Sequence, residues 1–586
     1  MRRCLLQIGY VFASLVVLLS VTACGPDPLS RLDREAADIL EHQRDRSLGI
    51  AAADVNVTPP APSADPRPDD YERQPETVNP PADALTIEPA PPRDRVPDPA
   101  VLDDGTQPDT LRLDLEGLIG RAIENAPDYR RQREDLFLTT LSLIVERHEW
   151  GPRFFSAVTG RVDGVPEAGD NETALNLIAS LGVTQRLPYG GSVSATALVD
   201  YVRLLERAST TTLPTETDAT ELQFSLDLPL LRGAGRSAAT VESRIQAERD
   251  LVYAVRDFER FRRTFFVDIA TRYFDLLRRQ RQLQNQELQL QNFRSSAELF
   301  SALAEAGRAP FFRAQRAEQR VLRAQNSLLN QQEGYVRQLD ALKLEVGIDP
   351  TQPLEILAVE IDVPEILLDL DTSVATALRQ RLDLQTVGDT IDDARRGVQI
   401  ARNGLLPDLD LDADVTVATD TTLQRGGLDF ELGDSAYDVG LTLGLPLDRK
   451  IEYTDFRAAL IRLERQRRDF TVERDRVSLE VRRAVRAIEQ ARFVLQLQER
   501  AIEINEKRAE QIQIDQRSLG PNEVIDVQED LLDARNDRDE AASDLRISIL
   551  EYLLATGQMR IGPDGRWRAP ASLRPVETPS NPPPTG

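Results

Sequence analysis

Cysteine and histidine are nearly absent from this sequence of 586 residues, which has two of each. Cys4 and Cys24 both lie at the extreme N-terminus, so the rest of the chain has no disulfide and no thiol chemistry. Neither His42 nor His148 has a metal-ligand partner at motif spacing. A phosphate-binding loop and a Gly-x-Ser-x-Gly motif are also missing. These shortages predict a protein that is not an enzyme and has no metal and no other cofactor.

Aromatic residues make up only 5% of the chain, whereas charged residues make up 29%, with a net charge of -26. Few aromatics and frequent Ala, Leu, Arg, Glu and Gln favour long helices over an all-β globule. Nucleic-acid binding requires a clustered positive surface, which this acidic chain does not indicate. The charge instead suits a wall that repels anions and tolerates cations.

The N-terminus has the pattern of a secretory leader. Met1-Arg2-Arg3 precedes an apolar run over 11–19, and Val21-Thr22-Ala23-Cys24 follows. The last four residues resemble a bacterial lipobox, which predicts a lipoprotein signal peptide over 1–23 and acylation of Cys24. An ordinary signal peptide is the alternative, and a transmembrane helix would need roughly 20 apolar residues. In families with this lipobox an Asp after the Cys retains the protein at the inner membrane; Gly25 here favours the outer membrane.

Two proline-rich segments bound the part expected to fold. Residues 24–109 include thirteen prolines between Pro59 and Pro99, and 561–586 are also rich in proline. We interpret the first segment as a disordered tether and the second as a disordered tail.

Helix breakers are missing from two long stretches. Neither 236–306 nor 447–519 contains Gly or Pro, so each could form a helix on the order of 105 Å long. Apolar residues recur every seven positions in both stretches, which predicts coiled-coil seams. The seam residues are Ile269, Leu276, Leu283 and Leu290, and Val481, Ile488, Leu495 and Ile502.

The two stretches belong to an internal repeat, predicted over 110–350 and 351–560. Each half has a short helical segment (115–150 and 372–403), then alternating strands, a Leu-Pro-Leu tripeptide, a long helix, a glycine turn and a return helix ending near Gly347 or Gly557. From Pro152 to Pro229 the first half spans 77 positions, against 39 from Pro407 to Pro446 in the second. The excess contains additional strand-like segments at 175–185 and 192–202. An enlarged barrel and a longer surface loop would both explain it.

This layout resembles the TolC-like outer-membrane efflux proteins over nearly all of residues 110–558. The matching features are the duplication, Leu228-Pro229-Leu230-Leu231-Arg232-Gly233 before the first long helix, and Gly520 followed by Val524-Ile525-Asp526-Val527. The resemblance implies a mainly helical homotrimer in which duplicated coiled-coil hairpins form an α-barrel in the periplasm and the strands form a β-barrel in the outer membrane. It also implies a lipid-anchored channel subunit of a tripartite efflux or type I secretion system, with a periplasmic adaptor and an inner-membrane pump or exporter as partners.

The resemblance further implies an acidic ring that narrows the tip of the tube. The family places acidic side chains a few residues after the second tip glycine, where this chain has Asp526 and Glu529. Three copies would give two stacked carboxylate rings, which select cations. A solvated acidic helix start is the alternative. The first half has Arg313 and Arg316 at the equivalent positions.

The two tips are the predicted adaptor contacts, although glycines that serve only to turn the chain would look the same. The contact residues are Gly307, Arg308 and Ala309, and Leu519, Gly520 and Pro521. The family's closed-state latch uses an aromatic and an Arg near the second tip, where this chain has Arg517 and Asn522. The main alternative function is a lipid-anchored periplasmic adaptor or scaffold without a pore.

Overall fold

The computed structural model describes residues 28–48, 110–167, 170–206, 216–235, 239–308, 310–358, 368–419, 430–514, 521–562 and 566–567. The chain divides into two compact units. Unit 1 comprises 1–47, 136–257 and 382–476, and unit 2 comprises 48–135, 258–381 and 477–586. Helices α4 (Pro127–Glu149), α5 (Ala239–Glu305) and α9 (Lys450–Ile514) contribute residues to both.

The element order is the same in the two halves of the chain apart from two additional strands in the first half. The first half contains β1 (Leu111–Leu113), α3 (Leu115–Asn125), α4 (Pro127–Glu149), β2 (Arg153–Glu167), β3 (Asp170–Arg186), β4 (Ser192–Glu206), β5 (Glu216–Pro229), α5 (Ala239–Glu305) and α6 (Phe311–Val346). The second contains β6 (Leu354–Ile356), α7 (Leu370–Gln380), α8 (Leu382–Asn403), β7 (Asp408–Thr419), β8 (Phe430–Gly444), α9 (Lys450–Ile514) and α10 (Pro521–Ala555). Helices α5 and α9 have 67 and 65 residues, so the two breaker-free stretches are helical as predicted.

Each short helical segment is two helices, not the one that the sequence predicted. The first segment breaks at Ala126, whose backbone is extended because Pro127 follows and disfavours the helical conformation before it. Pro127 then opens α4, where its missing N–H costs nothing. The second segment breaks at Arg381, which is also extended. The parallel pair of β1 and β6 was not predicted either, because three-residue strands carry too little alternation to detect.

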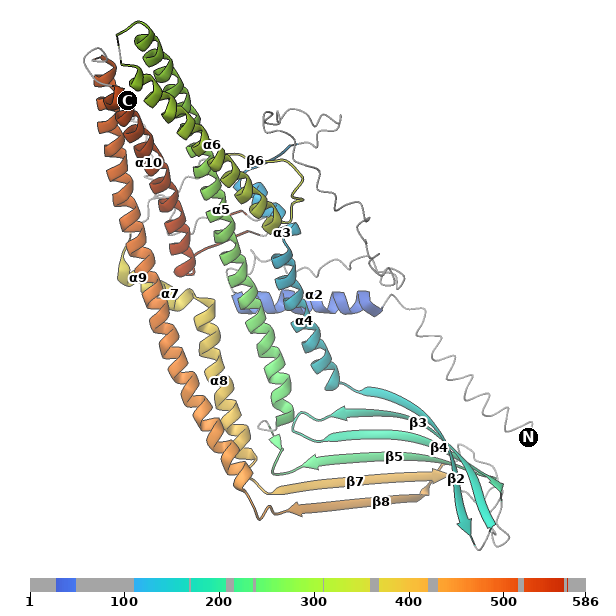
Figure 1. Ribbon diagram of the computed structural model, residues 1–586. Coiled ribbons are helices and arrows are strands. Elements are labelled where there is room, and N and C mark those ends of the chain that lie inside the picture. The colour runs from blue at the N-terminus through green and yellow to red at the C-terminus, as the bar shows by residue number, and fades with distance from the viewer. Residues whose placement is uncertain are drawn as a thin grey trace, which may run out of the picture. The chain divides into compact units, whose positions relative to one another are not determined.

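Unit 1 contains one antiparallel sheet of six strands in the order β2-β3-β4-β5-β7-β8 (Figure 1). The first half supplies four strands and the second half two, and β5 pairs with β7 where the halves meet. The excess of the first half is therefore two additional strands in the sheet. The sheet is open: within the described residues no further strand lies beside β2 or β8.

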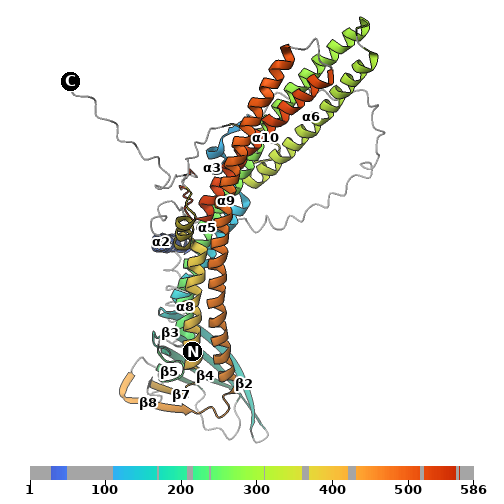
Figure 2. The same cartoon turned by 90° about the vertical axis from the view of Figure 1, so that its left-hand side faces the viewer.

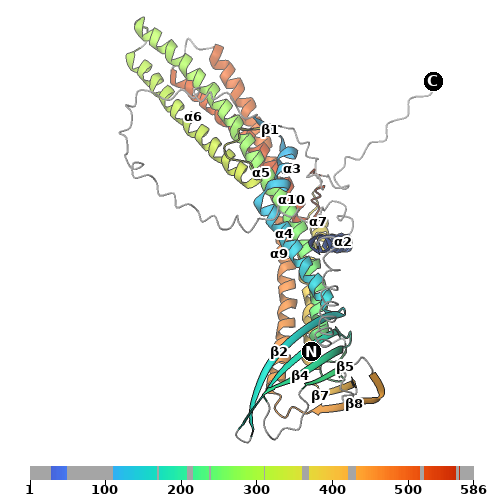
Figure 3. The same ribbon diagram turned by 90° about the vertical axis from the view of Figure 1, so that its right-hand side faces the viewer.

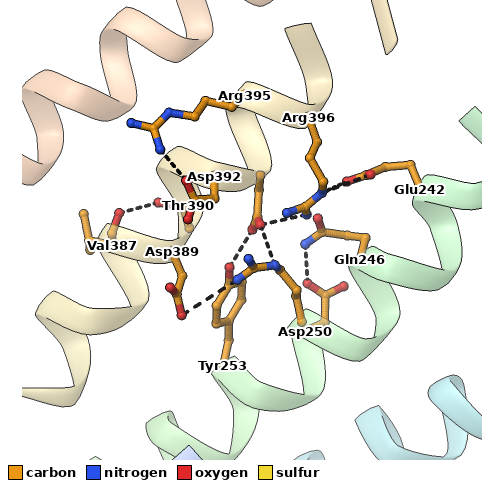
Figure 4. Close-up of polar contacts among 12 residues, drawn as sticks. Glu242, Gln246, Asp250, Tyr253, Val387, Asp389, Thr390, Asp392, Arg395 and Arg396 are labelled. Carbon is orange, nitrogen blue, oxygen red and sulfur yellow. Dashed lines mark hydrogen bonds and ion pairs between the residues drawn. The ribbon is translucent and has the colours of Figure 1, made fainter. Parts of the chain in front are cut away.

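A polar network in unit 1 connects α5 to α8 (Figure 4). Tyr253 donates a hydrogen bond of 2.6 Å to Asp393, and Arg256 contacts Asp389 at 2.7 Å. Arg396 bonds both Asp393, at 2.8 Å, and Glu242, at 2.9 Å. The pKa of Tyr253 is raised, and burial of its side chain is the largest cause. The hydrogen bond to Asp393 and the negative charge of Asp393 raise the pKa further. The network fixes the two helices that follow β5 and precede β7.

Unit 2 is built from helices that fold back on one another. Within it α6 returns along α5, and α10 along α9 (Figures 2 and 3). The predicted seams are buried most deeply where the apolar repeat is densest: Ile269, Leu276, Val481 and Ile488 are almost fully buried. Leu290 packs with Phe293 and Ala324 farther along the first hairpin. Both return helices end at a glycine in the left-handed region, Gly347 and Gly557.

A buried ionic cluster joins α5 to the end of the folded chain in unit 2. Glu259 accepts hydrogen bonds of 2.8 Å from Arg262 and from Arg263, and all three side chains are buried. Arg262 also donates to the carbonyls of Ile561 and Gly562, each at 3.2 Å. The prediction that the disordered tail begins at 561 is therefore wrong: Ile561 is buried and bridges Trp567.

The tether prediction is wrong for 28–48, which form helix α2 (Pro28–Leu48). Pro28 suits the first helical position, and the next proline is Pro59. Ala36 and Leu40, four residues apart, are buried on one face. The proline count of the following segment obscured this shorter amphipathic stretch. Residues 49–109 lie outside the described part of the chain.

We expect Tyr253→Phe to lower the free energy of unfolding by about 1–2 kcal/mol, because the carboxylate of Asp393 loses a hydrogen-bond donor in a half-buried site. Urea titration followed by helical circular dichroism measures this. Tyr453→Phe, in the same unit but with an exposed side chain, is the control and should change stability by less than about 0.5 kcal/mol. Equal effects of the two substitutions would contradict a stabilising role for the network.

Candidate functional site

The sheet of unit 1 has two unlike faces. Side chains alternate along each strand, and the pairing register keeps apolar residues of all six strands on one side. We call this side the apolar face. Its apolar members are Phe154, Val158, Val162, Leu175, Leu177, Ala179, Leu181, Val183, Val193, Ala195, Ala197, Val199, Tyr201, Leu222, Phe224, Leu226, Leu228, Leu409, Leu411, Ala413, Val415, Val417, Tyr437, Val439, Leu441 and Leu443.

Much of the apolar face is uncovered, most of all on the two outer strands. Phe154 on β2 is 79% exposed, and Tyr437 and Leu441 on β8 are 80% and 63% exposed. Phe224 and Val415 on the central strands are also exposed. Water-soluble monomers rarely expose a continuous apolar surface of this extent, so the face is suited to an apolar medium.

The opposite side, which we call the polar face, is acidic. Strand β7 alone places four aspartates there, at positions 408, 410, 412 and 414. Asp412 lies directly opposite Asp227 of β5, and Asp414 directly opposite Asp438 of β8. Like charges at such positions repel one another, so this face needs water and counter-ions. The two faces therefore require different solvents.

No helix in the described part of the chain has the length and apolar character needed to cross a membrane. Over the same residues, His, Cys, Asp and Glu side chains form no group of three or more that could hold a metal ion.

In unit 2 the predicted acidic pair lies on the first turns of α10 and shares one cation. Arg320 of α6 contacts Glu529 at 3.0 Å and Asp526 at 3.3 Å. The side chains of Asp526 and Glu529 are 62% and 44% exposed. The spacing of three residues thus places both carboxylates on one helix face, and within one chain they are partly neutralised.

Sequence reasoning missed Arg320. It identified Arg313 and Arg316 as the first-half equivalents of the acidic pair, but both are exposed side chains without a role in this contact. Arg320 continues their spacing along α6, seven residues after Arg313 and four after Arg316, so one helix face carries all three. The regular spacing of these arginines is the feature of the sequence from which Arg320 could have been identified. Whether copies of the acidic pair form a ring remains a prediction.

The first predicted tip is a tight turn between α5 and α6. Gly307 adopts φ of 66°, and a Cβ there would meet nothing within 4 Å, so its backbone conformation, not crowding, favours glycine. Arg308 and the following Phe311 and Phe312 are exposed. Pro521 opens α10. Ala309, Leu519, Gly520, the latch position Arg517 and the lipidation site Cys24 lie outside the described residues.

No protein-family model and no curated protein matches the sequence. Solved structures do match. The outer-membrane protein VceC of Vibrio cholerae is 19% identical, with a TM-score of 0.52 over 76% of this chain and 96% of that one. The MtrE outer-membrane channel of Neisseria gonorrhoeae, in its open state, is 14% identical, with a TM-score of 0.55 over 77% and 90%. The CmeC outer-membrane channel of Campylobacter jejuni is 14% identical, with a TM-score of 0.53 over 76% and 85%. The prediction of a mainly helical fold with duplicated long hairpins and an antiparallel sheet is confirmed, while the described strands of one chain form no closed barrel.

We expect Arg320→Gln to lower the free energy of unfolding by less than about 1 kcal/mol, because both carboxylates that it contacts are largely solvated. Urea titration measures the change, and Arg316→Gln, one turn earlier on the same helix, is the matched control. A loss of several kcal/mol specific to Arg320 would show that the contact is part of the structural core and not an adjustable surface charge.

Proposed function

We propose that this chain is the outer-membrane channel subunit of a tripartite efflux or type I secretion system. The observation that carries the proposal is the sheet of unit 1, with one uncovered apolar face and one acidic face, in a chain that shares its fold with outer-membrane channels. The role is transport and not catalysis.

The backbone of the sheet supports oligomerisation. In a bilayer no water is present to satisfy the edge groups of an open sheet, so spanning strands must close into a barrel. Six strands from one chain leave β2 and β8 unpaired within the described residues. Three copies with the apolar face toward lipid and the polar face toward the lumen would give the edge strands hydrogen-bond partners and each face the solvent that it requires. This agrees with the homotrimer that the family resemblance implies.

In this proposal unit 2 lies in the periplasm. Its tip residues, including Gly307 and Arg308, would contact a periplasmic adaptor that an inner-membrane pump or exporter engages. Asp526 and Glu529 would line the lumen near the tip and favour cations. Acylation of Cys24 would anchor the chain in the outer membrane.

A lipid-anchored scaffold without a pore does not explain the uncovered apolar face. A periplasmic scaffold lies in water throughout, where this face would promote aggregation.

We expect Leu441→Arg to prevent stable insertion into the outer membrane, whereas Thr442→Arg, the next residue of β8 on the polar face, should be tolerated. An arginine facing lipid costs about 2–4 kcal/mol near the bilayer centre, and one facing an aqueous lumen costs far less. The measurement is the amount of protein in the outer-membrane fraction after urea extraction. Equal yields of the two variants would count against a membrane-spanning sheet.

In planar bilayers we expect cation-selective channels whose selectivity falls in Asp526→Asn combined with Glu529→Gln and rises in Arg320→Gln, because the second change removes the cation that offsets the acidic pair. Reversal potentials in a salt gradient measure this. Asp530→Asn is the matched control, since Asp530 pairs with Arg508 of α9 instead. Selectivity that is the same in all variants would exclude the acidic pair from the conduction path.

A further inference from the structure

The extra strands of the first half are a discrete insertion. Strand β2 follows α4 as β7 follows α8, and β5 precedes α5 as β8 precedes α9, so the hairpin of β3 and β4 has no counterpart in the second half. This hairpin, Asp170 to Glu206, has 37 residues. Without it the first half would span 40 positions from Pro152 to Pro229, one more than the 39 from Pro407 to Pro446. The inserted strands lie inside the sheet, between β2 and β5.

The joint between the halves shows how one repeat follows another. The last strand of the first repeat, β5, pairs antiparallel with the first strand of the second, β7. The register includes Leu226 opposite Ala413 and Phe224 opposite Val415. The two edge strands of the sheet occupy the corresponding positions in the other repeat. Strand β8 is the last sheet strand of the second repeat, and β2 is the first sheet strand of the first repeat.

The backbone N–H and C=O groups that face outward from β2 and β8 belong to residues suited to the same kind of pairing as that between β5 and β7. Leu230 donates to Leu409 across the β5–β7 ladder, and Leu187 donates to Gly191 beyond the β3–β4 ladder. Hydrogen-bonded and non-bonded pairs alternate along antiparallel ladders, so the directions can be followed from strand to strand. The outward backbone groups then belong to the even-numbered residues 154–162 of β2 and the odd-numbered residues 437–443 of β8. Both sets lie on the apolar face.

We propose that β8 of one copy pairs antiparallel with β2 of the next in the register of the β5–β7 joint, and that three copies close a barrel of 18 strands. The inference rests on the proposed function and adds the interface and the width of the pore. Transferring the β5–β7 register by the two Leu-Pro-Leu tripeptides and by Pro152 and Pro407 places Leu441 opposite Gly160, Leu443 opposite Val158 and Thr442 opposite Thr159.

The side chains on both faces suit this register. The apolar face continues without a polar break from Leu443 and Leu441 to Val158 and Val162. Gly160, between these valines, gives the larger Leu441 room. On the polar face, exposed Arg161 lies diagonally from exposed Asp438, which offsets the direct opposition of Asp163 to Asp438.

The insertion sets the width of the pore. With a strand spacing of about 4.8 Å and a tilt of about 40°, a barrel of 18 strands has a backbone diameter of about 36 Å, against about 24 Å for 12 strands. Without the hairpin, three copies would supply four strands each and form the narrower barrel. The hairpin therefore widens the barrel and leaves the order of helices in the two repeats unchanged.

Cysteine cross-linking of the full chain in isolated outer membranes tests the register. Thr159→Cys combined with Thr442→Cys places two thiols at a non-bonded pair, where Cα atoms lie about 4.5 Å apart, and mild oxidation should link copies into species no larger than a trimer. Thr159→Cys with Asp438→Cys shifts one thiol by four residues, about 14 Å, and should not link. Each single variant controls for Cys4 and Cys24.

The outcomes separate this inference from the proposed function. If the double variant conducts ions but does not cross-link, or if the shifted pair links equally well, the edge pairing is overturned and the channel stands. Linking through Thr159→Cys alone would show β2 paired with β2 and would also overturn it, as would covalent species larger than a trimer. Failure of the unmodified chain to reach the outer membrane or to conduct would overturn the proposed function and this inference together.

Discussion

The structure depends on the requirement that backbone N–H and C=O groups be paired wherever water is excluded. Long helices meet the requirement internally. Because 236–306 and 447–519 contain no Gly or Pro, α5 and α9 form without interruption over 67 and 65 residues. A sheet meets it only through neighbouring strands. Unit 1 meets it in the five ladders that join its six strands and leaves it open at β2 and β8. Partners for those two edges are the main thing that a single chain lacks.

Charge is handled differently according to burial. Glu259 is buried, and two arginines and the backbone carbonyls around them satisfy the cluster, because an unpaired buried charge would cost several kcal/mol. The aspartates of the polar face oppose one another and depend on water instead. Asp526 and Glu529 are intermediate, exposed but sharing Arg320. The net negative charge of the sequence is thus concentrated where solvent can reach it.

Sequence alone predicted the features that extend over many residues. The repeat, the two long helices and the alternation of β7 were all readable because each rests on a period or on the absence of breakers. Short or distant features were not. Strands β1 and β6 have three residues each, α2 stands next to a proline-rich segment, and Arg320 meets its carboxylates from another helix. The sequence also could not show whether the excess of the first half forms extra strands in the sheet or a longer surface loop, because alternation does not say which strand pairs with which.

The parallel pair of β1 and β6 has a consequence for the order in which the chain matures. Leu111 pairs with Leu354, and the two are separated by 243 positions, so the first strand to be synthesised waits for nearly half the chain before its partner exists. Contacts between residues so distant in sequence form slowly, because a long loop has to close first. An incomplete chain that ends within the first repeat lacks this pairing and also lacks β7 and β8. In such a product Leu111–Leu113 has no partner strand, so the pairing that joins the two repeats forms only once the second repeat has been synthesised.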